Sequence, residues 1–152
     1  YIPYVVETSI GVDRMFLQVI AASYFEEDLT KEDGTPDSRV VLRLPAALAP
    51  VKLAVMPLGR KDGLPDISRR IISDLKFDFN CQYDEKDSIG KRYRRQDAIG
   101  TPYCITIDYQ TVQDETVTIR YRDSMEQERV SVSQLRAIIA DKVSMQEQLK
   151  KL

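Results

Sequence analysis

Residues near the start of the chain have the types and spacing that an anion-binding site needs. The stretch Glu7-Thr-Ser-Ile-Gly-Val-Asp-Arg14 places a glycine before a helix-like run and an arginine one turn inside that run. The amide groups of a helix N-terminus attract anions, and the Arg14 guanidinium can reach the same phosphate. Glu7 and Ser9 alternate along the preceding strand-like residues, so they can offer an anionic and a neutral group to an ammonium. On spacing alone, a plain strand-to-helix corner with a glycine for geometry is the favoured interpretation.

A second candidate set consists of four cations on little more than one helical turn: Lys91, Arg92, Arg94 and Arg95. Ser88 is placed to cap this helix through its hydroxyl, and Gly100 to end it in a left-handed conformation. Arginine suits contacts to phosphates and bases, but composition alone favours a solvated charged face, because acidic residues lie nearby. Arg120 and Arg122 alternate on one face of a later strand, where they can serve the same groove or be surface charges.

Composition excludes several classes of site. The 152 residues include 22 Lys and Arg, 24 Asp and Glu and no His, so any nucleic-acid site must be a local patch. We find no Walker-type loop, zinc-ligand spacing or Ser-His-Asp set, and we expect no metal site.

Cys81 and Cys104 lie in strand-like runs and are predicted to be free thiols in a reducing compartment. No apolar run is long enough to span a bilayer and no signal peptide begins the chain, so we expect no membrane partner.

Residues from 51 onwards alternate between strand-like and helix-like patterns. Strands are predicted over 51–58, 79–83, 103–107, 116–122 and 127–131, and helices over 64–77, from Ser88 to Gly100, and after Ser133. The order β-α-β-α-β-β-β-α predicts parallel pairing through right-handed crossovers, followed by an antiparallel hairpin. The expected fold is a three-layer α/β domain with a mixed sheet of about five strands.

Residues before 51 are predicted to form an arm and a connection. Tyr1–Glu7 is strand-like, and Val12 to about Phe25 has helical spacing that is apolar nearly all round. Glu26–Ser38 is acidic and rich in turn residues, which indicates an exposed linker, and Arg39–Leu44 is strand-like again. Because the chain opens at Tyr1 inside a strand-like run, we expect a piece of a longer protein.

Two separate stretches resemble one family, the class II aminoacyl-tRNA synthetases. Pro3–Glu27 looks like the third signature motif of that class, and its form Glu-x-Ser-x-Gly-Val-Asp-Arg is similar to the glycyl-tRNA synthetases in particular. Ala46 to about Met145 resembles the C-terminal anticodon-binding domain of the glycyl, threonyl, prolyl and histidyl enzymes. Leu48–Val55 (LAPVKLAV) and the segment from Ile89 to Tyr103 carry that second match.

The resemblance implies three parts and a set of residue roles. Residues 1–27 would be the C-terminal edge of the catalytic domain, 28–44 a linker and connecting strand, and 45–152 the anticodon-binding domain. The glycine pocket would be lined by Glu7, Ser9 and Gly11, with Glu7 facing the substrate ammonium. ATP would be bound by Gly11, Val12, Asp13 and Arg14. Arg14 would also be the catalytic arginine that stabilises charge during adenylate formation.

In related domains the anticodon loop lies across the loop after the first strand and the start of the second helix. Here these segments are about 57–62 and 87–95. The implied tRNA contacts are Asp87, Lys91, Arg92, Arg94 and Arg95. Arg92 and Arg94 would contact backbone or bases, and Asp87 would accept a hydrogen bond from a base edge.

The resemblance also implies a parent enzyme, a cytoplasmic and homodimeric ligase that joins glycine to tRNA-Gly with ATP and Mg²⁺ and binds no DNA. The first two signature motifs are absent, so we expect the fragment to be inactive alone and to bind no cofactor. One alternative is a stand-alone module that uses the anticodon-binding fold for protein or RNA interaction without catalysis, although the intact Glu-x-Ser-x-Gly-x-x-Arg argues against it. Another is a small-molecule domain whose basic helix is merely solvated.

Overall fold

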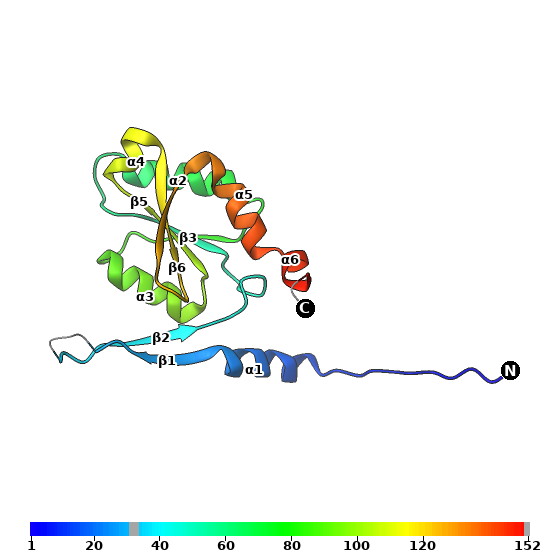
Figure 1. The fold of residues 1–152 in the computed structure, drawn as a ribbon. Coiled ribbons are helices and arrows are strands. Elements are labelled where there is room, and N and C mark those ends of the chain that lie inside the picture. The colour runs from blue at the N-terminus through cyan, green and yellow to red at the C-terminus, as the bar shows by residue number, and fades with distance from the viewer. Residues whose placement is uncertain (31–33, 151–152) are drawn as a thin grey trace.

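The centre of the protein is a mixed sheet of five strands in the order β4-β3-β5-β6-β7 (Figure 1). The structure is a computed structural model that describes residues 1–30 and 34–150. The strands of this sheet are β3 (Leu53–Pro57), β4 (Cys81–Tyr83), β5 (Tyr103–Ile107), β6 (Thr116–Tyr121) and β7 (Gln127–Ser131). β3 pairs in parallel with β4 and β5, whereas β6 pairs antiparallel with β5 and β7. The predicted fold class, α/β with a mixed sheet of about five strands, is confirmed.

Helices cover both faces of this sheet. The helices of the described residues are α1 (Val12–Ser23), α2 (Leu64–Leu75), α3 (Ile89–Ile99), α4 (Tyr109–Asp114), α5 (Val132–Val143) and α6 (Met145–Leu149). α2 and α5 share one apolar cluster with the sheet, in which Ile71 and Leu135 pack with Val55 and Ile105. α4 lies outside the predicted elements, and Asp108 begins it with a capping box. None of the helices in the described part of the chain is both long and apolar enough to cross a membrane.

α3 covers the opposite face, where Ile89 and Tyr93 pack on a small cluster formed by Ala54, Met56 and Cys104. The helix ends as predicted, because Gly100 adopts a left-handed conformation with φ of 84°. A Cβ at this position would also lie 3.0 Å from the Leu42 carbonyl oxygen, so glycine permits the close approach of β2. The predicted hydroxyl cap is wrong in its detail: Ser88 is the N-cap residue, but its side chain makes no capping hydrogen bond.

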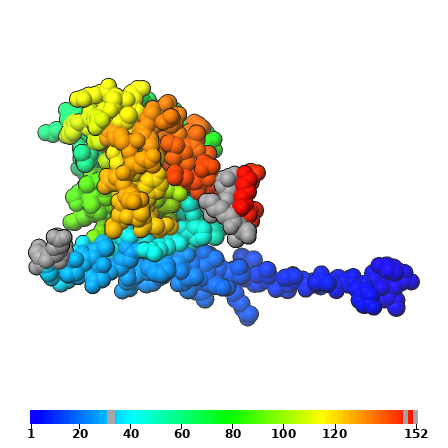
Figure 2. Space-filling view, in the orientation of Figure 1, coloured from blue at the N-terminus to red at the C-terminus, as the bar shows by residue number. Residues whose placement is uncertain are grey.

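The segment before α1 differs from the prediction. Residues 1–11 form no regular secondary structure, although a strand is predicted over Tyr1–Glu7. No described strand lies beside them, and an unpaired strand leaves its backbone N–H and C=O groups without partners. Figures 1 and 2 show this segment extending away from the rest of the protein.

The expected linker instead contains one strand of a hairpin. β1 (Tyr24–Asp28) and β2 (Ser38–Leu42) pair antiparallel, with Tyr24 opposite Leu42. α1 therefore ends at Ser23, two residues before the predicted end, because Tyr24 and Phe25 belong to the hairpin. Residues 31–33 of the expected linker and 151–152 of the expected 45–152 domain lie outside the described residues.

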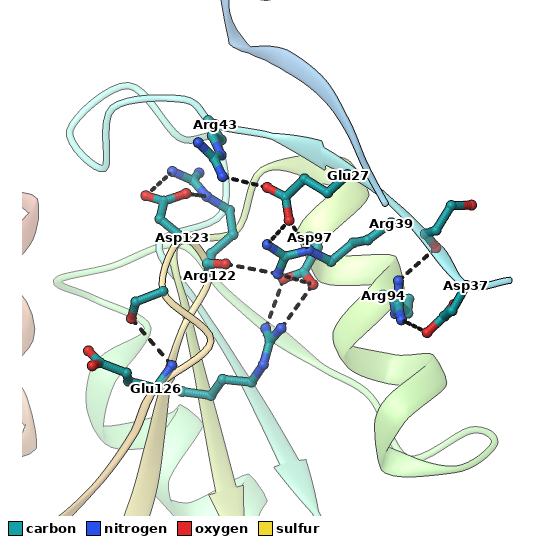
Figure 3. Close-up of polar contacts among 12 residues, drawn as sticks. Glu27, Asp37, Arg39, Arg43, Arg94, Asp97, Arg122, Asp123 and Glu126 are labelled. Carbon is teal, nitrogen blue, oxygen red and sulfur yellow. Dashed lines mark hydrogen bonds and ion pairs between the residues drawn. The ribbon is translucent and has the colours of Figure 1, made fainter. Parts of the chain in front are cut away.

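A buried carboxylate joins the hairpin, α3 and the sheet (Figure 3). Asp97 of α3 is fully buried, and its oxygens accept hydrogen bonds from Arg120 of β6 at 2.8 and 3.1 Å and from Arg39 of β2 at 3.1 Å. Arg39 also donates to Glu27 of β1 at 2.9 Å through its Nε. Burial acts to raise the pKa of Glu27, but hydrogen bonds from Arg39 and Arg43 outweigh it and lower the pKa. The network ties three separate segments of the chain together.

The same network corrects the expectation for the two strand arginines. Arg120 and Arg122 are 6% and 3% exposed, so they are not surface charges. The Arg122 guanidinium donates to the carbonyl oxygens of Gly100 and Leu44, each at 2.9 Å, and pairs with Asp123. Both arginines therefore hold the hairpin connection and the end of α3 against the sheet.

Replacing Asp97 with Asn should reduce the free energy of unfolding by about 3 kcal/mol, because loss of one partner leaves buried guanidinium groups uncompensated. Urea unfolding followed by circular dichroism measures this loss. Asp37→Asn is the matched control, since the Asp37 side chain is 37% exposed in its ion pair with Arg94. An exposed pair contributes less than about 1 kcal/mol. Equal losses in the two variants would contradict the central role of Asp97.

Candidate functional site

The carboxyl edge of the parallel strands brings together the loops that follow β3, β4 and β5. The chain passes from β3 to β4 on one side and then to β5 on the other, so its direction across the sheet reverses beside β3. Ligand sites of open α/β sheets lie at such reversal points, outside the carboxyl ends of the strands. The residues predicted to meet an anticodon loop, 57–62 and 87–95, lie at this edge. The structure therefore supports their proximity to one another.

Arg95 holds the loop between β4 and α3. Its guanidinium donates to the Asp84 carboxylate at 2.8 and 3.1 Å, to the Asp87 carboxylate at 2.8 Å and to the Lys86 carbonyl oxygen at 2.6 Å. Asp87 has a φ of 68°, which is uncommon for a residue other than glycine. The hydrogen bond from Arg95 lowers the pKa of Asp87, and the two aspartates raise the pKa of Arg95. Asp87 and Arg95 are thus both exposed at the edge and already paired with each other.

The other three cations of the cluster point in different directions. Lys91 is exposed and makes no hydrogen bond or ion pair with any residue that the structure describes. Arg94 turns towards the hairpin, where it donates to Asp37 at 2.6 Å and to the Ser38 carbonyl oxygen at 2.7 Å (Figure 3). Arg92 is only 3% exposed. The cations that appear as one patch in the sequence therefore have separate surroundings, and their contacts to tRNA stay predictions.

Arg92 spans the ends of two strands. Its Nη1 donates to the carbonyl oxygens of Pro57 at 2.6 Å and Asp84 at 3.3 Å. Its Nη2 lies 3.4 Å from the Leu58 carbonyl oxygen. The guanidinium is thus enclosed by the backbone at the edge, and the expected contact of Arg92 with nucleic acid stays a prediction.

The structure adds residues at this edge that the sequence does not single out. Arg60 donates to the Glu85 carbonyl oxygen at 3.2 Å through two nitrogens and so links the loops after β3 and β4. Arg129 of β7 donates to the Asp108 carboxylate, and this hydrogen bond lowers the pKa of Asp108. Arg60 lies in a loop that the sequence places near the site. Arg129 has no such signal, since only the pairing of β6 and β7 brings it beside Asp108.

The candidate set predicted over Glu7–Arg14 lies on the arm. Gly11 is the N-cap of α1, and a Cβ there would lie 3.7 Å from the Cδ of Arg14, so the arginine side chain lies beside the glycine. The predicted residues all lie on the exposed surface: Glu7, Ser9, Gly11, Val12, Asp13 and Arg14. The structure brings together Gly11 and Arg14, and shows no contact from either of them to Glu7 or Ser9 among the described residues.

An apolar groove runs beside this arm. Its volume is about 500 Å³, and it is lined on one side by α1, including Met15 and Phe16, and on the other by Leu42, Leu44 and Leu48. The Phe16 side chain is 68% exposed. α1 therefore exposes apolar surface beside this groove.

Comparison with known proteins identifies relatives of the chain. The profile of a family described as "Anticodon binding domain" matches residues 52–142. The chain is 51% identical over 143 residues to a glycine–tRNA ligase of Borreliella burgdorferi, covering 94% of this chain and 31% of that protein. It is 50% identical over 139 residues to the glycine–tRNA ligase of Clostridium perfringens, covering 91% and 29%. The chain therefore spans less than a third of the length of these curated relatives.

Two solved structures share the fold. A prolyl-tRNA synthetase from Cryptosporidium parvum, complexed with halofuginone and AMPPNP, has a TM-score of 0.63 at 21% identity and covers 72% of this chain and 24% of that one. The RNA binding domain of a threonyl-tRNA synthetase from Cryptosporidium parvum has a TM-score of 0.59 at 22% identity, covering 66% and 25%. At these identities the likeness concerns the fold alone.

Replacing Arg95 with Gln should raise the pKa of Asp87 towards its ordinary value, because the main hydrogen bond that favours the carboxylate is lost. Carboxyl ¹³C chemical shifts recorded against pH measure this change. Lys91→Gln is the control: Lys91 acts on Asp87 through space only, so a smaller rise is expected. An unchanged Asp87 titration in the Arg95 variant would show that Arg95 does not hold this loop.

Proposed function

The chain belongs to the family of anticodon binding domains, and from this premise we propose that it is the C-terminal, tRNA-reading part of a glycine–tRNA ligase. The single observation that carries the proposal is the position of the family match, residues 52–142, which begins one residue before β3 and ends within α5, so that it includes the whole five-stranded sheet. The near-50% identity to glycine–tRNA ligases over nine-tenths of the chain supports glycine as the amino acid.

The carboxyl edge is the proposed anticodon surface. Among the four clustered cations the most available is Lys91, because Arg94 and Arg95 are held by aspartates and Arg92 is buried. An exposed lysine can neutralise a phosphate of the anticodon loop, and the paired Asp87 can present its remaining acceptor capacity to a base edge. Arg95 and Arg94 can contribute once tRNA competes with their aspartates.

The arm is the proposed edge of the catalytic domain, with boundaries at 1–27, 28–44 and 45–152. Glu7, Ser9 and Gly11 would line the glycine pocket, and Gly11, Val12, Asp13 and Arg14 would contact ATP. The proximity of Arg14 to Gly11 supports this assignment. The apolar surface of α1 also supports it, because such surface needs a partner. Mg²⁺ would accompany ATP as part of the substrate, and a second subunit would complete the parent enzyme.

We place the parent in a reducing, cytoplasmic setting. Cys81 and Cys104 are free, which supports this assignment. Burial raises the pKa of Cys104 to about 12 and that of Cys81 to about 11, so both thiols stay protonated and unreactive near neutral pH.

Purified chain should bind tRNA-Gly with an affinity that falls steeply as salt rises, because released counterions drive the binding. Replacing Lys91 with Met should reduce the slope of log affinity against log salt by about 0.7 to 0.9, the change expected for one lost phosphate contact. Fluorescence anisotropy across a salt series measures both quantities.

Lys76→Met is the matched control for this experiment. Lys76 follows α2 and lies over the Phe77 ring, at the opposite end of that helix from the carboxyl edge. The Lys76→Met variant removes the same charge as Lys91→Met and should leave the slope of log affinity against log salt unchanged. Equal affinity for tRNA-Gly and for unrelated tRNAs would show that the binding is electrostatic and non-specific. It would favour a general binding module over anticodon recognition.

The isolated chain should form no glycyl adenylate, since its arm supplies only one wall of a catalytic site. Exchange of labelled pyrophosphate into ATP in the presence of glycine measures adenylate formation. Exchange above a no-enzyme blank that disappears in Arg14→Ala would contradict the proposal that catalysis needs the rest of the parent.

A further inference from the structure

Arg92 is an unusual buried charge. It is 3% exposed, and its Nε is the buried side-chain nitrogen or oxygen without a hydrogen-bond partner in the part of the chain that the structure describes. Its guanidinium also makes no ion pair with any described residue. Its hydrogen bonds go to backbone carbonyl oxygens alone. A buried charge without a carboxylate is unfavourable for stability, so stability alone does not explain an arginine at this position.

The acidic residue that Arg92 contacts has its carboxylate engaged elsewhere. Asp84 gives its backbone carbonyl oxygen to Arg92, at 3.3 Å, but its carboxylate accepts from Arg95 and from the Lys86 amide. The positive charge of Arg92 is therefore not cancelled by a direct ion pair. It remains just below the carboxyl edge of the sheet.

The hydrogen bonds of Arg92 act on two loops at once. Pro57 is the last residue of β3 and Leu58 begins the loop after it, whereas Asp84 follows β4 directly. Arg60 adds a second link between these loops through the Glu85 carbonyl oxygen. Arg92 thus holds the 58–63 loop and the 84–88 loop from beneath, while Arg60 joins them at the surface.

Both loops contain backbone that needs such support. Asp62 has a φ of 60° and Asp87 a φ of 68°, and non-glycine residues in this region are held there only by their surroundings. Resting on the proposed function, we propose that Arg92 is a positioning residue for RNA recognition. It fixes the two loops in the conformation that meets the anticodon and supplies positive potential to the edge, without touching the RNA itself.

The experiment compares Arg92→Met with Arg92→Lys in the full chain. Methionine removes the charge and all three carbonyl interactions, and lysine keeps the charge but replaces the planar fork with a single ammonium. Amide hydrogen exchange in the absence of RNA should accelerate about tenfold or more in both loops of Arg92→Met, since losing these contacts favours opening by about 1.4 kcal/mol. Exchange in β3 and β5 should stay slow and shows that the variant is folded.

Binding of tRNA-Gly separates positioning from contact. Arg92→Met should weaken binding about tenfold, and the salt slope should fall by less than in Lys91→Met, because a nearby charge is removed but no phosphate contact is lost. Arg92→Lys should show the same accelerated loop exchange with a smaller loss of affinity. Lys91→Met, on the adjacent exposed position, should behave oppositely, with normal loop exchange and a reduced salt slope.

Two results would overturn the inference. Wild-type exchange rates in both loops of Arg92→Met would show that Arg92 does not hold them, and a salt slope reduced as in Lys91→Met would make Arg92 a direct contact. If Arg92→Met does not fold, the loop exchange of Arg92→Lys decides the question in the same way. Absence of tRNA binding by the wild-type chain would instead refute the proposed function, and the exchange measurement would still test the support of the loops.

Discussion

The fold depends on one buried carboxylate. Asp97 pairs with two guanidinium groups that come from different elements, Arg39 from the hairpin and Arg120 from the sheet. Because breaking a buried ion pair by removing one partner is strongly unfavourable, these contacts hold the three segments in one arrangement. α3 is thereby fixed with Asp97 inward, while Lys91 faces solvent at the carboxyl edge. The same helix can serve as a structural centre on one side and as a binding surface on the other.

Local sequence signals were sufficient for most of the sheet. The apolar run Tyr103–Ile107, the left-handed Gly100 and the alternation of strand with helix depend on neighbouring residues, so they can be read without knowing the fold. The parallel order also follows from local information, because strand-helix-strand connections have a fixed hand. The resemblance to glycyl-tRNA synthetases added what composition could not, namely the expectation that the loops at the carboxyl edge meet the anticodon loop of tRNA.

The errors share a physical cause. The sequence does not reveal β1 because the acidic, turn-rich segment that follows it dominates the local pattern. Its pairing with β2, which the sequence predicts as the strand Arg39–Leu44, is visible only when both strands are aligned. The sequence does not reveal which arginines are buried, because their burial depends on partners far along the chain: Arg39 and Asp97 are separated by 58 residues, and Arg122 and Leu44 by 78. In the sequence Arg92 cannot be told from the neighbouring cations. It differs from them because the fold buries it against the end of β3.

The junction of α1 and β1 has a consequence for the arm. Ser23 ends the helix and Tyr24 begins the strand, with no residue between them. The hairpin register therefore sets not only the distance of Arg14 from the sheet but also its angle around the helix axis. An α-helix turns by about 100° per residue, so a single inserted residue at this junction would rotate the whole apolar side of α1 away from its groove. The direct connection therefore fixes the rotation of α1 relative to the hairpin, so its length matters as much as any side chain.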